Sequence, residues 1–142
     1  MHLIAIYLVA KNCHIWHNMN SKDFLRPVVW IGSSRGDLKS LPAEVQNDVG
    51  FALFRAQEGK KHESAKPMKG YKGAGVLEIV ENHFGNTYRA VYIVKLADVI
   101  YVLHVFQKKS KHGIATPKNE IEMIEKRLKI AEEHYRNWTK GR

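Results

Sequence analysis

The sequence contains one cysteine, four prolines and no long apolar run. Because Cys13 has no second cysteine to pair with, an internal disulfide framework is excluded and a reducing compartment is favoured. The apolar opening MHLIAIYLVA (residues 1–10) is too short to cross a bilayer, and it lacks a cationic start and a small-residue cleavage site. We therefore expect a cytoplasmic protein with no membrane partner.

Signatures of metal and cofactor chemistry are also scarce. Cys13, His14 and His17 form at most half of a zinc site, and no second cluster follows them. The sequence has no glycine-rich phosphate loop and no Ser/His/Asp signature. We therefore expect no metal and no cofactor.

Acidic residues are few compared with basic ones, at 14 against 23, which gives a net charge of +9. The excess lies in residues 59–142, with 17 basic and 9 acidic side chains, whereas residues 1–58 hold 6 and 5. Such a cationic half favours an anionic partner, meaning nucleic acid, an anionic membrane surface or an acidic protein. A soluble protein that is simply basic is the alternative. The length of 142 residues suits one domain.

The order of elements predicts an α+β fold. A β-branched run at 26–32 predicts a strand, and 33–42 predicts a capped turn or one-turn helix. A helix with Pro42 at its first position follows, and Gly59 ends it. After an irregular basic connection at 59–75, strands at 76–82, 87–95 and 99–109 with short turns predict an antiparallel meander. We expect one antiparallel sheet with helices to one side.

The tail has the strongest helical pattern. Thr116 can cap a helix and Pro117 can occupy its first position. Apolar residues then recur at spacings of three and four, which is typical of an amphipathic helix that packs on a sheet or a partner: Ile121, Ile124, Leu128, Ala131, Tyr135 and Trp138.

Strand alternation predicts which side chains share a face. It places Ile100, Val102, His104, Phe106 and Lys108 on one face of the last strand. Glu78 and Arg89 are charges inside apolar strands, and a partly buried ion pair would explain both. His104 alone would most often be a hydrogen-bonded core histidine.

Together these residues also suit metal-free RNA cleavage. In-line attack by a ribose 2′-hydroxyl needs a base, an acid and fixed positive charge at the phosphate. The candidate catalytic residues are Glu78, Arg89, His104, Lys108 and Lys109. Phe106 could stack on an extruded base. The other candidate RNA-binding residues lie on the loop before the meander and after the last strand: Lys66, Lys69, Lys72, Lys111 and His112.

Three motifs, KPM (66–68), YRAVYIVK (88–95) and VLHVFQKKS (102–110), resemble those of phage-related, HigB-like toxins of the RelE/ParE superfamily. The resemblance extends over residues 26–135. It implies a toxin of a type II toxin–antitoxin pair that cleaves messenger RNA on the ribosome. It also implies a helix-turn-helix, HigA-like antitoxin as partner, encoded beside the toxin. We assign the toxin domain to residues 26–142 and treat 1–25 as an extension, with translation expected to start at Met19.

The resemblance also assigns roles to individual residues. It places Arg89 against the scissile phosphate and Lys108 and Lys109 at the cationic end of the last strand. Many relatives have Trp–Glu–(Ile/Leu)–Arg on the first meander strand, where this chain has LEIV (77–80), so Glu78 is either a base or only the partner of Arg89. A non-enzymatic, ParE-like poison of DNA gyrase and an inert phage-derived binding protein remain alternatives. The cationic cluster favours the ribonuclease.

Overall fold

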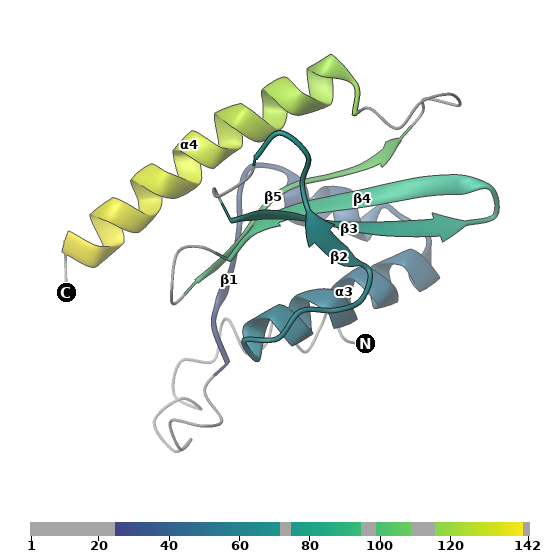
Figure 1. The fold of residues 1–142 in the computed structure, drawn as a ribbon, viewed down its shortest axis with the longest axis horizontal. Coiled ribbons are helices and arrows are strands. Elements are labelled where there is room, and N and C mark those ends of the chain that lie inside the picture. Colours follow the sequence, from purple (N-terminus) through teal and green to yellow (C-terminus); the bar gives the residue numbers. More distant parts are fainter. Residues whose placement is uncertain (1–24, 72–74, 95–98, 109–115, 141–142) are drawn as a thin grey trace.

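In the computed structural model, residues 25–71, 75–94, 99–108 and 116–140 are described. They form eight elements, which Figure 1 shows in order along the chain: β1 (Val28–Trp30), α2 (Ser34–Lys39), α3 (Ala43–Gln57), β2 (Ala65–Pro67), β3 (Val76–His83), β4 (Asn86–Ile93), β5 (Ile100–Lys108) and α4 (Lys118–Lys140). The predicted α+β class is confirmed. Two details of the structure differ from the prediction. Pro42 precedes α3 as its N-cap, and the connection contains the short strand β2.

The five strands form one sheet in the order β1-β5-β4-β3-β2. The meander β3-β4-β5 is antiparallel as predicted, and β2 extends it antiparallel to β3. β1, however, pairs parallel with β5, with Val28 opposite Ile100. The prediction of a wholly antiparallel sheet was wrong in this respect. A parallel neighbour needs no tight turn, so no local sequence signal marks it.

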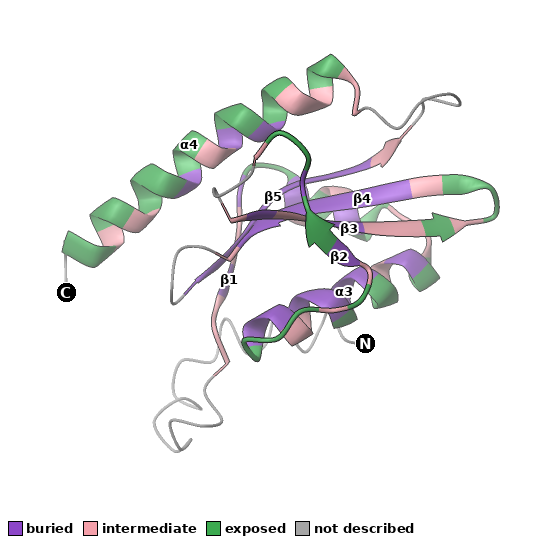
Figure 2. Ribbon diagram, viewed as in Figure 1, coloured by how far each residue is buried: buried purple, intermediate pink, exposed green. Residues whose placement is uncertain are grey.

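The helices cover both faces of the sheet, not one side as the sequence analysis expected. In Figure 1, α3 lies against one face and α4 against the other. Figure 2 shows the buried residues of each helix turned toward the strands between them. The α3 side buries Val45, Val49 and Leu53 with Tyr92 of β4. The α4 side buries Ile124 and Ala131 among residues of β4 and β5. Each amphipathic helix therefore has its own core.

A β-bulge in β5 changes which side chains share a face. The register pairs Val91 with His104 but Tyr92 with Val102, so Leu103 is the extra residue. Ile100 and Val102 consequently pack on the α3 side, whereas Phe106 packs on the α4 side with Leu103. The predicted common face for Ile100, Val102 and His104 was wrong, because a bulge breaks the period of two.

The helix α4 confirms the predicted amphipathic tail. All six apolar positions of the predicted stripe pack against the α4-side core, with Ile124 and Ala131 fully buried. The helix begins at Lys118, and the carbonyl of Pro117 accepts bonds from the amides of Glu120 and Ile121. Within the described ranges, no helix is both long enough and apolar enough to cross a membrane.

Two buried tyrosines make stability fall in strong alkali. Burial raises the pKa of Tyr92 and of Tyr101 from 10.0 to about 12. A raised pKa means that folding favours the neutral phenol, so this stabilisation is complete below pH 10.0 and is lost as pH rises through about 12. Urea unfolding should therefore give a falling free energy between these pH values, and absorbance titration should show two late-ionising tyrosines. Ionisation of both near pH 10.0, with the fold intact, would contradict this expectation.

Candidate anion-binding pocket

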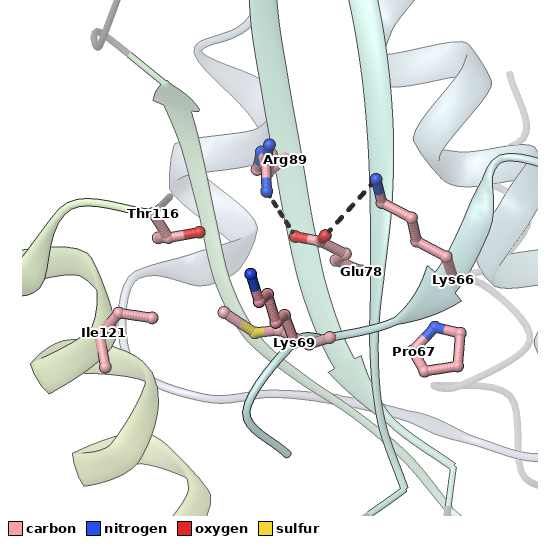
Figure 3. Close-up of a pocket in the computed structure, with 8 residues that line it drawn as sticks. Lys66, Pro67, Lys69, Glu78, Arg89, Thr116 and Ile121 are labelled. Atoms are coloured by element: carbon pink, nitrogen blue, oxygen red, sulfur yellow. Dashed lines mark hydrogen bonds and ion pairs between the residues drawn. The ribbon is translucent and has the colours of Figure 1, made fainter. Parts of the chain in front are cut away.

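A pocket of about 490 Å³ opens on the α4 side of the sheet. Figure 3 shows side chains from three regions around it: β2 and the residues after it, the strands β3 and β4, and the start of α4. The pocket is lined by Lys66, Pro67, Met68, Lys69, Glu78, Arg89, Thr116 and Ile121. From the sequence, Thr116 was predicted to cap the helix and Ile121 to pack in the core. Their place in the wall depends on how α4 crosses the sheet, and no local motif encodes that.

Glu78 lies between two cations at the base of this pocket (Figure 3). Its Oε2 accepts a hydrogen bond of 2.9 Å from Nη1 of Arg89, and its Oε1 lies 3.9 Å from Nζ of Lys66. Lys66 is directly opposite Glu78 in the β2–β3 register, whereas Arg89 is opposite Val80 and reaches Glu78 diagonally. Both members of the Arg89–Glu78 pair are buried. The cross-strand ion pair considered in the sequence analysis is therefore present.

Arg89 is more than a counter-ion for Glu78. Its side chain is 9% exposed, and its Nε is buried without a hydrogen-bond partner among the described residues. A buried donor left unsatisfied costs about 1–3 kcal/mol. Arg89 also lines the pocket, so the guanidinium is placed to meet a ligand there. Because a guanidinium presents several donors in a rigid fork, a phosphate oxygen suits it well.

Lys108 adds charge beside Arg89. Partial burial lowers the pKa of its ammonium, the positive charge of Arg89 lowers it further, Glu78 opposes the shift and Lys66 adds to it. Lys108 is thus close enough to Arg89, Lys66 and Glu78 for their charges to act on it. Lys69, which is exposed, extends into the same pocket (Figure 3). The site therefore has an excess of positive charge.

His104 lies in a hydrogen-bond network between the sheet and α4. Its Nε2 contacts Oε2 of Glu120, and its Nδ1 is 3.3 Å from Nη1 of Arg127. The same Nη1 donates to the carbonyl of Leu103 at 3.0 Å, and Nη2 of Arg127 donates to Ser33 Oγ at 3.0 Å. Both ring nitrogens have partners on α4. The geometry therefore indicates that His104 helps to hold α4 against the sheet. Arg127 and Glu120 were not singled out from the sequence, because charges on an amphipathic helix usually face solvent.

Phe106 is also buried, at 7% exposure, and its ring stacks on that of His104 with centroids 4.8 Å apart. This packing leaves little of the ring accessible to a base. The remaining predicted RNA-binding and catalytic positions lie outside the described residues: Lys72, Lys109, Lys111 and His112.

A second hollow, of about 500 Å³, lies on the α3 side and has acidic walls that include Asp48 and Glu81. Burial raises the pKa of Glu81, and the negative charge of Asp48 raises it further. A phosphate would be repelled there, so the two hollows differ in the charge they accept. Among the described residues, no group of three or more His, Cys, Asp or Glu side chains could hold a metal ion.

The fold and the pocket define a small α+β protein with a cationic, partly buried site suited to a phosphate group. Residues 36–129 match the family model described as "Phage derived protein Gp49-like (DUF891)". The chain belongs to this Gp49-like family, a toxin-like family of the RelE/HigB type. The match includes every residue of the pocket wall. No curated protein matches the sequence.

Proposed function

We propose that the chain is the toxin of a type II toxin–antitoxin system and cleaves messenger RNA on the ribosome. The observation that carries this proposal is the pocket itself, in which Arg89, Lys66 and Lys69 surround the buried carboxylate of Glu78. Membership of a toxin-like family supports the biological role. A helix-turn-helix antitoxin, HigA-like and encoded beside the toxin, is the proposed partner.

The proposed reaction is attack by the ribose 2′-hydroxyl on the adjacent phosphorus. Glu78, the carboxylate in the pocket, takes the hydroxyl proton as the 2′-oxygen bonds to phosphorus. The bond from phosphorus to the 5′-oxygen breaks, and Lys108 protonates that oxygen. The products are a 2′,3′-cyclic phosphate and a free 5′-hydroxyl. Arg89 and Lys66 stabilise the negative charge that develops on the phosphorane-like transition state.

The lowered pKa of Lys108 favours its role as the acid. An ammonium whose pKa lies below its usual value gives up a proton more readily, because that pKa is closer to the working pH. His104 takes no part in the proposed reaction, because Glu120 and Arg127 occupy its nitrogens. Lys69 binds the backbone of the RNA beside the scissile phosphate.

Induction of the gene in a bacterium should arrest protein synthesis first, with transcripts cut inside translated codons. Pulse-labelling of protein and of DNA, together with mapping of transcript 5′ ends, measures this. Co-expression of the adjacent helix-turn-helix gene should restore growth. Early arrest of DNA synthesis with intact messenger RNA would instead indicate a gyrase poison, and normal growth would indicate an inert binding protein.

A further inference from the structure

The turn between β3 and β4 carries the most exposed of the large apolar side chains in the described residues. Phe84 is 90% exposed, and its ring makes an edge contact with that of His83 at a centroid distance of 4.5 Å. The β3–β4 hairpin projects beyond both helices at the right of Figure 1, and its tip is exposed in Figure 2. The phenyl ring therefore belongs to neither core.

The backbone at this position also disfavours phenylalanine. Phe84 has φ 48° and Gly85 has φ 78°, between the end of β3 at His83 and the start of β4 at Asn86. Two successive positive φ values in a two-residue loop are typical of a type I′ turn, in which Asn-Gly is strongly preferred. A bulky residue there is strained. Phe84 thus stabilises neither the turn nor a core, and such outliers indicate a functional constraint.

The ligand chemistry follows from the surroundings of the tip. Thr87, one residue into β4, lies opposite Lys108, and Arg89 follows two residues later on the same face. At about 3.4 Å per residue, the strand places Arg89 roughly 15 Å from the tip. The nearby carboxylate of Glu44 is paired with His83 at 3.2 Å. Lys108 and Arg89 therefore lie on one face of the hairpin, and the exposed aromatic ring lies at its tip beside His83.

We infer that Phe84 stacks on an unpaired base of the RNA whose backbone passes Lys108 and enters the Arg89 pocket. An aromatic ring near a positively charged path is the usual means of holding single-stranded nucleic acid, because every base offers a face for stacking. The inference rests on the proposed function for the path of the RNA. It concerns binding and not cleavage.

Fluorescence anisotropy with a labelled, unstructured single-stranded ribo-oligonucleotide tests the inference. Phe84→Asn should weaken binding by about tenfold, whereas Phe84→Trp, which keeps an aromatic face, should bind at least as tightly as wild type. Because Asn suits the turn, Phe84→Asn should also melt at a higher temperature than wild type. A substitution that stabilises the fold while it weakens RNA binding would separate function from folding.

Three results would overturn the inference: equal RNA affinity for Phe84→Asn and wild type, equal weakening by Phe84→Trp and Phe84→Asn, or no RNA binding by wild type. In the first case, loss of antitoxin binding by Phe84→Asn would assign the ring to a protein partner instead. The induction experiment decides the proposed function separately. Translation arrest with equal affinities leaves that function standing, and weakened RNA binding without translation arrest leaves the stacking role standing.

Discussion

Replacing Arg89 by glutamine should lower RNA cleavage by about a hundredfold or more and abolish toxicity, because a preorganised charge at the phosphate contributes roughly 2–4 kcal/mol to the transition state. The fold should survive. Glutamine can still donate a hydrogen bond toward Glu78, and Lys66 remains 3.9 Å from the same carboxylate. The purified variant should melt near wild type and still bind the antitoxin.

Arg89→Lys is the matched control for the shape of the cation. Lysine keeps the charge but loses the planar fork, so its cleavage rate should fall between those of wild type and Arg89→Gln. Cleavage rates and thermal melts of the three proteins provide the comparison. A folded Arg89→Gln protein with full toxicity would remove Arg89 from the active site. A variant that is non-toxic because it unfolds would assign Arg89 to structure alone.

Replacing Arg127 by methionine should instead lower the stability of the fold, by about 3 kcal/mol. As whole residues, Arg127 and Arg89 are each 8% exposed, but the donors of Arg127 bond to the Leu103 carbonyl and to Ser33 Oγ. Methionine fills the space and leaves these acceptors, together with the adjacent His104, without their charged partner. Urea unfolding measures the effect.

Arg136→Met on the exposed side of α4 is the matched control, and its stability should change by less than about 0.5 kcal/mol. Equal unfolding midpoints for Arg127→Met and wild type would contradict the view that this hydrogen-bond network holds α4 against the sheet. A stable Arg127→Met protein that lost cleavage would instead connect Arg127 to the pocket.

Of these two arginines, only Arg89 could be recognised as important from the sequence. Arg89 was recognisable because a charge inside an apolar strand must have a partner or a function. Arg127 lies in a helix with many charges, and its burial depends on the loop at Gly32. An added Cβ at Gly32 would lie 2.9 Å from Nε of Arg127. That close approach joins residues far apart in the sequence, so no local pattern reports it.

The strands and helices themselves were largely predictable, since apolar periodicity reflects burial within each element. The register between strands and the face on which each helix packs were less predictable. The bulge at Leu103 arises from the β4–β5 register, and it moved Ile100 and Val102 away from the face of His104. The opposite placements of α3 and α4 depend on which face each helix reaches after its loop.

Aromatic residues show the same limit at the site. The motif around Phe106 predicted a stacking residue, yet that ring is buried against His104. Phe84 was part of a correctly predicted tight turn, but its exposure and its positive φ became visible only in the folded chain. Composition identifies which rings are available, and packing decides which of them solvent or a ligand can reach.

Because β1 pairs with β5, the sheet is not complete until most of the chain has been synthesised. β1, α2 and α3 leave the ribosome first, and they must wait for the whole meander before β1 gains its hydrogen-bonding neighbour. Long-range pairing of this kind makes folding slow. The pocket also needs Thr116 and Ile121, which are made later still. Chains released before these residues are made would therefore lack a finished site.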